Sequence, residues 1–277
     1  MAEMKKGMML PGHLIKSRKL VWNLAKNDIR KKFAGSYFGV IWAFVQPVIT
    51  VLLYWFVFEK GLNSKATDLR TGIEIPFVLW LMAGLVPWFY FQEAMNGGTG
   101  VLVEYSYLVK KVVFQIDILP VVKMISALFT HLFFVVFAIL IFACMGYYPN
   151  PYMLQVIYYS FCMILFTTGL VYATSAVTVF FRDMKEVVAI VLQIGMWVTP
   201  IMWNFESMVQ IPGWAVTILK LNPMYYIVSG YRDALINQIG FWEYPGLTLY
   251  FWVVTAALLL LGTAVFKRLR PHFADVL

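Results

Sequence analysis

Few side chains of this sequence could take part in metal, nucleophilic or proton chemistry, and those few are far apart. The three histidines, His13, His131 and His272, are separated by long stretches of chain. Cys144 and Cys162 both fall inside apolar runs, where packing is their expected role. Neither a G-x-x-x-x-G-K-[ST] phosphate loop nor an H-E-x-x-H zinc motif is present. We therefore predict no catalytic residue, no metal site and no cofactor held by this chain, so any use of ATP needs another subunit.

The basic residues are the side chains whose type and spacing suggest a function. The chain has 22 Lys and Arg against 14 Asp and Glu, a formal charge of +8. Arg30, Lys31 and Lys32 form a run that could hold phosphate, and fixing the membrane topology is the alternative role for them. Basic residues lie beside apolar runs, and no nucleic-acid-reading motif is present. This pattern predicts contact with anionic lipid head groups and no nucleic-acid partner.

Long apolar segments must position these charges. Of all residues, 61% are hydrophobic and only 13% are charged, whereas charged residues make up about 25% of an average soluble protein. Several runs reach the roughly 20 residues that cross a bilayer. We predict an all-α, polytopic membrane protein with a single transmembrane domain over residues 1–277. Its six predicted spans are residues 38–58, 77–92, 119–145, 153–181, 187–203 and 247–266.

Counting the basic residues on each side gives the orientation. If the N-terminus is inside, 17 of the 22 Lys and Arg fall on the inner side and 5 on the outer side. Loops with excess Lys and Arg stay in the cytoplasm. The sequence therefore predicts a multi-pass protein with both termini in the cytoplasm.

Three further segments do not read as simple spans. Residues 13–33 alternate apolar and basic faces with helical spacing, which predicts an amphipathic helix at the membrane surface; packing on a soluble partner is the alternative. Residues 93–118 read as a cytoplasmic loop, either with a short helix that docks on a cytoplasmic partner or as an ordinary solvated loop. Residues 205–246 are apolar but broken at Asn222-Pro223, which predicts a re-entrant pair of short helices in the outer leaflet.

The span interiors hold almost no charge, and this bears on the source of energy. Ion-coupled carriers place ionisable side chains at mid-membrane. Here only His131 lies well inside a span, where we expect a hydrogen bond to a neighbouring helix and keep a proton relay as the alternative. The sequence therefore disfavours an ion-coupled transporter, which we keep as an alternative together with a membrane-bound glycan-binding scaffold.

Several motifs in order resemble the permeases of ABC transporters that export bacterial polysaccharides. They are RKKFAGSYFGVIW at residues 30–42, QP at 46–47, YWFVF at 54–58, GLVPWF at 84–89, FRD at 181–183 and NP at 222–223. Within that class the aromatic motifs look most like the wall teichoic acid exporter permease, and O-antigen and capsule permeases are close alternatives. The resemblance covers nearly the whole chain and implies a bacterial cytoplasmic membrane location.

The resemblance also implies partners. In such exporters, two permease chains pair with two copies of a separate ATP-binding subunit, which binds ATP and Mg²⁺ and pushes on a cytoplasmic coupling helix. The stretch that matches this helix is about 105–117. The implied coupling residues are Tyr107, Leu108, Lys110, Lys111, Phe114 and Asp117.

A lipid-linked glycopolymer such as teichoic acid has a diphosphate head and a polar chain. Its path needs cations at the inner surface and uncharged, stackable walls beyond. Arg30, Lys31 and Lys32 are the candidates for the head group. Phe38, Trp42, Trp55 and Trp88 are the candidates for the path, although most aromatic side chains of membrane proteins face lipid.

Overall fold

A computed structural model of the chain describes residues 17–32, 34–110, 114–203 and 212–277. The main helices are α2 (Arg18–Lys32), α3 (Trp42–Trp55), α4 (Phe77–Glu104), α5 (Ser106–Val109), α6 (Leu119–Cys144), α7 (Gln155–Phe180), α8 (Met184–Val198), α9 (Gly213–Lys220), α10 (Pro223–Arg232), α11 (Pro245–Leu269) and α12 (Phe273–Val276). Shorter helical turns are η1 (Gly39–Ile41), η2 (Phe56–Gly61), η3 (Ile116–Ile118), η4 (Pro151–Leu154), η6 (Asp233–Asn237), η7 (Phe241–Glu243) and η8 (Arg270–His272). A two-stranded antiparallel ribbon, β1 (Ala66–Thr67) and β2 (Glu74–Ile75), pairs Ala66 with Ile75.

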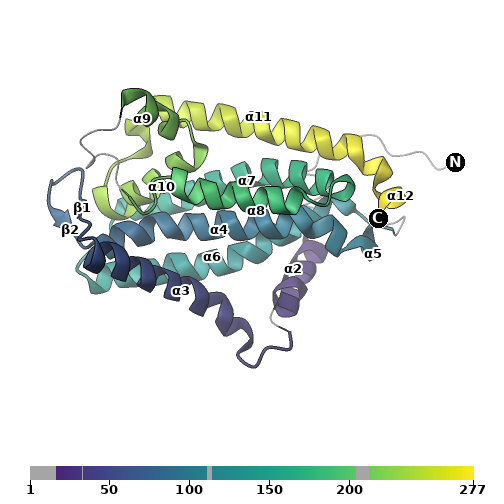
Figure 1. Cartoon of the computed structure of the whole chain (residues 1–277), viewed down its shortest axis with the longest axis horizontal. Coiled ribbons are helices and arrows are strands. Elements are labelled where there is room, and N and C mark those ends of the chain that lie inside the picture. Colours follow the sequence, from purple (N-terminus) through teal and green to yellow (C-terminus); the bar gives the residue numbers. More distant parts are fainter. Residues whose placement is uncertain (1–16, 33, 111–113, 204–211) are drawn as a thin grey trace.

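Helix α4 forms the centre of the bundle. It packs against α6 on one side and α7 on the other, and α11 packs along α7. Helix α3 lies at the edge (Figure 1), where none of its residues is buried and Trp42, Ile49, Leu52 and Leu53 are exposed. The core is therefore built from α4, α6 and α7, and α3 and α8 offer large apolar surfaces to their surroundings.

Five helical stretches are long and apolar enough to cross a membrane, which agrees with the predicted all-α polytopic fold. They are Trp42–Gly61, Phe77–Glu104, Ile116–Cys144, Pro151–Phe180 and Pro245–Val276. The remaining predicted span, 187–203, corresponds to α8, whose 15 residues reach only about 22 Å at the usual rise per residue. The count of six spans therefore stays a prediction.

The helix boundaries differ most from the expectation around residue 93. Helix α4 continues to Glu104, so residues 93–104 are helical where the sequence suggested a loop. Gly97, Gly98 and Gly100 do not break the helix. They lie where it closely approaches Lys123, Val171 and Lys185, respectively. Among the described residues of the predicted coupling segment, α5 and η3 remain as short helices.

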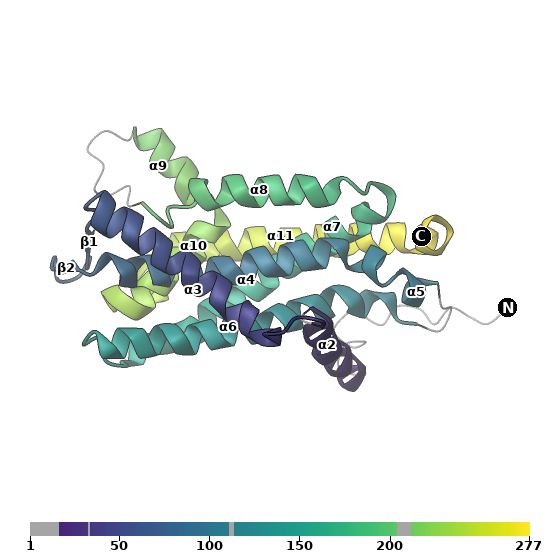
Figure 2. The same ribbon diagram turned by 60° about the horizontal axis from the view of Figure 1, so that its bottom comes forward.

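The two ends of the bundle carry different elements. Helices α2 and α5 and the C-terminus lie at one end, which we call the inner end, and β1, β2 and α9 lie at the other, the outer end (Figures 1 and 2). At the inner end, helix α2 packs Val21 and Ala25 against Ile118 of η3 and Val122 of α6. The described part of the predicted helix 13–33 thus rests on the bundle; residues 13–16 and 33 lie outside the described residues. Which end faces the cytoplasm stays a prediction.

In the outer segment, the structure places α9 and α10 on either side of the Asn222-Pro223 break. The Asn222 side chain accepts a hydrogen bond from the Met224 backbone N–H at 3.0 Å and so caps α10. Helix α10 is largely buried against α4 and α7. The expected entry of this pair into the outer leaflet stays a prediction, and residues 205–211 lie outside the described part of the chain.

Helices α7 and α11 cross where neither has a side chain. A Cβ added to Gly262 would overlap the carbonyl oxygen of Gly169, and one added to Gly169 would lie 2.7 Å from the Leu258 carbonyl carbon. Close approach through small residues is a common means of helix association in membranes.

We expect Gly262→Val to push α11 away from α7 and to destabilise the fold by about 1–3 kcal/mol, the usual cost of overpacking. Thermal unfolding of the purified protein in detergent measures this. Gly246→Val is the matched control, because Gly246 lies in the same helix and its added side chain meets open space. Equal melting temperatures for the two variants would contradict a close helix crossing.

Candidate transport groove

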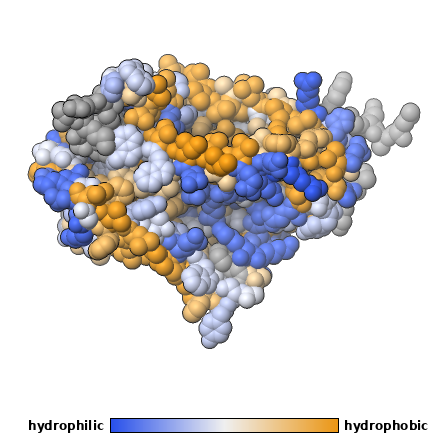
Figure 3. Space-filling model, in the orientation of Figure 1, coloured by the Kyte–Doolittle hydropathy of each residue, from blue (hydrophilic) through white to orange (hydrophobic). Residues whose placement is uncertain are grey.

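A polar groove of about 610 Å³ lies between α3, α4, α6 and α8. Its lining residues are Lys32, Trp42, Ala43, Gln46, Pro47, Thr50, Tyr54, Phe89, Gln92, Glu93, Asn96, Gly97, Thr130 and Met196. Hydrophilic side chains gather in the middle of this face, between the hydrophobic surfaces over α8 and α3 (Figure 3). Polar side chains between otherwise apolar helices are a common feature of substrate pathways in membrane proteins.

The groove follows from the spacing of residues on two helices. On α3, Trp42, Gln46, Thr50 and Tyr54 recur every fourth residue and therefore share one face. On α4, the range 89–97 supplies Phe89, Gln92, Glu93 and Asn96, whose i, i+3, i+4 and i+7 spacing also puts them on one helix face. The two faces combine amide and hydroxyl groups with aromatic rings, which suits a chain of sugars.

An ion pair lies at one edge of the groove. Lys32 Nζ, at the end of α2, donates a hydrogen bond to Glu93 Oε1 at 2.6 Å. The two side chains are 49% and 27% exposed, so water screens the pair and its net contribution to stability is about 0–1 kcal/mol. An anionic ligand could therefore replace Glu93 as the partner of Lys32 at little cost.

The structure brings only some of the predicted substrate residues together. Lys32 and Trp42 line the groove, and Phe38 makes an edge contact with the Trp42 ring at 5.9 Å between centroids. Lys31 Nζ lies 5.5 Å from the centre of the Tyr105 ring, and Arg30 is exposed beside it in sequence.

Two predicted path residues lie away from the groove. Trp88 is 2% exposed and packs towards α8, where an added Cβ on Gly195 would lie 3.1 Å from its ring. Trp55 lies beneath Lys60 Nζ, which is 5.6 Å from its ring centre. Neither tryptophan is among the groove's lining residues.

The predicted coupling residues divide by exposure. Tyr107 is 52% exposed, Lys110 is exposed, and Leu108 is half-buried. Phe114 packs partly into the inner cluster of apolar side chains. Lys111 lies outside the described residues. Among the described coupling residues, Tyr107 and Lys110 are therefore the most accessible.

Asp117, the last of the coupling residues, is buried and supports the bundle from within. Its backbone carbonyl accepts a hydrogen bond from Tyr172 Oη at 2.7 Å, and its carboxylate lies 3.8 Å from Arg270 Nη1. Because Asp117 is buried and joins η3, α7 and η8, a structural role within this chain fits it better than a contact to another chain.

A buried ionic cluster, which the sequence did not reveal, ties α2 to the bundle. Asp28 of α2 accepts hydrogen bonds from Lys123 Nζ at 2.6 Å and from Tyr105 Oη at 2.9 Å. Lys123 also pairs with Glu104 at 2.8 Å. Burial, together with the hydrogen bond to Asp28, raises the pKa of Tyr105, so its hydroxyl stays a neutral donor. The cluster joins α2, the end of α4 and α6.

His131 is buried and hydrogen-bonded to neighbouring helices, as expected. Its Nε2 lies 3.0 Å from Tyr231 Oη of α10 and 3.3 Å from Ser160 Oγ of α7. Among the residues that the structure describes, no three His, Cys, Asp or Glu side chains gather as metal ligands would.

This architecture, with a polar groove in a mostly apolar helical bundle, is that of a membrane transport component. Residues 19–236 match the family described as ABC-2 type transporter, and the chain belongs to that family.

Among its relatives, the chain is 24% identical over 262 residues to the O-antigen export system permease protein RfbA of Myxococcus xanthus, covering 95% of this chain and 96% of that protein. It is 22% identical over 256 residues to a protein of the same description from Klebsiella pneumoniae, covering 92% and 93%.

Proposed function

We propose that this chain is the membrane subunit of an ATP-driven exporter that moves a lipid-linked surface glycopolymer across the bacterial cytoplasmic membrane. The observation that carries the proposal is the groove between α3 and α4, with a cation at its edge and amide, hydroxyl and aromatic groups along its length. A diphosphate head and a polar sugar chain need this combination of groups.

The exporter that we propose contains two copies of this chain and two copies of a separate ATP-binding subunit. Helix α3 supports the pairing, because it forms one wall of the groove while its other faces expose Ile49, Leu52 and Leu53. A second copy would both cover this apolar face and enclose the polar one. ATP and Mg²⁺ belong to the partner subunit, which contacts the inner end.

The polymer that we propose first is wall teichoic acid, on the resemblance of the aromatic motifs in the ranges 54–58 and 84–89. O-antigen or capsule is the second candidate, supported by relatives whose descriptions specify O-antigen export. All these candidates share a lipid-linked head with phosphate, so the same groove and the same Lys32 would serve them.

Purified permease and ATP-binding subunit in sealed vesicles test the proposal. We expect polymer carrying its lipid diphosphate to move only with ATP present and to persist when ionophores remove every ion gradient. Movement by this chain alone on a proton gradient, abolished in His131→Ala, would favour an ion-coupled carrier instead. No movement with ATP and all co-purifying subunits would favour a glycan-binding scaffold. Vesicles loaded with teichoic acid or O-antigen precursors identify the polymer.

We expect the double variant Tyr107→Ala, Lys110→Ala to lower ATP-driven export by at least about tenfold, because loss of about 1.4 kcal/mol of contact energy weakens the docked state by that factor. The measured quantities are export and ATP hydrolysis by the reconstituted complex. Lys267→Ala is a matched control, since it removes an exposed cation from the inner part of α11. Unchanged export in the double variant would exclude α5 as the docking element.

A further inference from the structure

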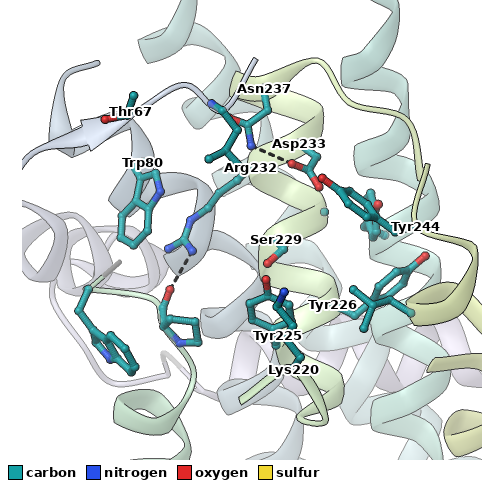
Figure 4. Close-up of a pocket in the computed structure, with 16 residues that line it drawn as sticks. Thr67, Trp80, Lys220, Tyr225, Tyr226, Ser229, Arg232, Asp233, Asn237 and Tyr244 are labelled. Carbon is teal, nitrogen blue, oxygen red and sulfur yellow. Dashed lines mark hydrogen bonds between the residues drawn. The ribbon is translucent and has the colours of Figure 1, made fainter. Parts of the chain in front are cut away.

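A second pocket lies at the outer end, separate from the groove. It holds about 150 Å³ and is bounded by α4, α7, α10, η6, the chain after α8 and the chain before α11. None of its lining residues belongs to the transport groove. Figure 4 shows its side chains pointing toward one another from several elements.

One wall of the pocket is held rigidly by Arg232, which is 7% exposed. Its guanidinium donates to the carbonyl oxygens of Pro200 and Ile201 at 2.8 and 2.9 Å. The same group lies 3.3 Å from the centre of the Trp80 ring. These contacts tie α10 to α4 and to the segment that follows α8, so this wall of the pocket is held in place by contacts within the chain.

Side chains that donate hydrogen bonds and side chains that accept them both line the pocket. Asp233 Oδ1 accepts a hydrogen bond from Asn237 Nδ2 at 2.8 Å, and Asn237 Oδ1 in turn accepts from the Leu69 backbone N–H at 3.1 Å. Ser229 lies between this pair and the tyrosines in Figure 4. Lys220 is a further lining residue. Carboxylate, amide, hydroxyl and ammonium groups in one small pocket suit a ligand that both donates and accepts hydrogen bonds.

Aromatic rings complete the enclosure. Tyr226 is fixed, since its ring stacks on Phe251 at 4.8 Å and its hydroxyl lies 3.0 Å from Thr248 Oγ1. Tyr244 is 38% exposed and lies at the mouth, beside Asp233 in Figure 4. A flat apolar face rimmed by hydrogen-bonding groups is the surface that a sugar ring presents, and an aromatic ring beside polar side chains matches it.

We propose that this outer pocket binds a single sugar unit of the exported glycopolymer, an inference that rests on the proposed function. The mixture of Lys220 and Arg232 with Asp233 fits a neutral sugar better than a bare anion or a metal cation. The volume of about 150 Å³ is below the roughly 300–1,000 Å³ of common small-molecule sites, and so admits one ring and not a chain. The polymer would be held here, after the groove, as it leaves the membrane.

Binding of a defined probe tests the inference. The probe is the lipid-free oligosaccharide repeat released by mild acid from the surface polymer of the cell that makes this chain. Binding of the repeat to the permease, together with its ATP-binding subunit in nanodiscs, is measured by saturation-transfer NMR and by titration. Ser229→Trp fills the pocket, and we expect it to weaken binding by at least about tenfold, a loss of about 1.4 kcal/mol. Tyr244→Ala removes the exposed ring, and we expect about a fivefold loss from missing stacking.

Two variants control for these changes. Ser64→Trp adds the same bulk at another half-buried serine of the outer end, and Tyr148→Ala removes an exposed tyrosine outside the pocket. Both should bind the repeat as the unaltered protein does. The inference is overturned if the unaltered complex does not bind the repeat, or if Ser229→Trp and Tyr244→Ala both bind it normally. ATP-driven export by the unaltered complex, measured in parallel, shows whether the proposed function itself survives such a result.

Discussion

Replacing Lys32 with Glu should reduce export of the lipid-linked polymer by at least about tenfold, since a hydrogen bond to a charged group contributes about 1.5–3 kcal/mol. The physical reason is that Lys32 is the cation that lines the groove beside Trp42, while the reversed charge repels the diphosphate head. Export by reconstituted vesicles is the measurement. The fold should survive, because the pair with Glu93 is partly exposed and screened.

The charge swap Lys32→Glu, Glu93→Lys separates two roles of this pair. It restores an ion pair between α2 and α4 but moves the cation to the other helix. If the head group needs its cation at position 32, the swapped protein stays defective. If export returns, a cation is not needed at position 32 itself, since residue 93 lines the same groove, and the head-group role of Lys32 is contradicted. Lys26→Glu is the control, because Lys26 is exposed on the same helix and does not line the groove.

The broad fold was accessible from the sequence because a bilayer leaves the backbone few options. A segment in hydrocarbon must satisfy its own N–H and C=O groups, so an apolar run of about 20 residues becomes a helix whatever its neighbours are. The helices α6, α7 and α11 accordingly begin and end within a few residues of their predicted spans. Helix α8 has only 15 residues, and its length alone does not decide whether it crosses.

Helix α4 shows where local rules were insufficient. The predicted loop 93–118 contains three glycines within the range 97–100, and glycine has a low helix propensity. In the structure they are places of close packing, where Gly98 faces the Val171 side chain and Gly100 faces Lys185. Tertiary contact outweighed propensity, and the neighbours of a glycine cannot be read from one sequence.

The groove was only partly accessible for a similar reason. The repeat of Trp42, Gln46, Thr50 and Tyr54 is visible in the sequence and could have indicated a polar face on α3. Its partner face on α4 could not be paired with it without knowing which helices are neighbours. Glu93 was assigned to a loop, so its contact with Lys32, 61 residues away in sequence, was not anticipated.

Lys123→Ala should destabilise the protein by about 3–5 kcal/mol, because it leaves the buried carboxylate of Asp28 without its cation. Asp28 and Lys123 are 95 residues apart in sequence and 2.6 Å apart in the structure, with side chains that are 7% and 13% exposed. Thermal unfolding in detergent measures the effect. Glu104→Ala is the matched control: Glu104 also pairs with Lys123, but its side chain is 49% exposed, so its loss should cost less than about 1 kcal/mol.

The double variant Asp28→Asn, Lys123→Met distinguishes charge from packing. Asparagine still accepts the hydrogen bond from Tyr105, and methionine keeps most of the bulk of Lys123, so no charge remains buried and unpaired. We expect its melting temperature to lie well above that of Lys123→Ala. If both variants melt together, packing and not the ion pair holds α2 to the bundle. This cluster joins α2 and α6 to the end of α4, directly before α5. Loosening it should therefore also lower export per ATP hydrolysed, because movement of α5 would be lost in relative movement of these helices.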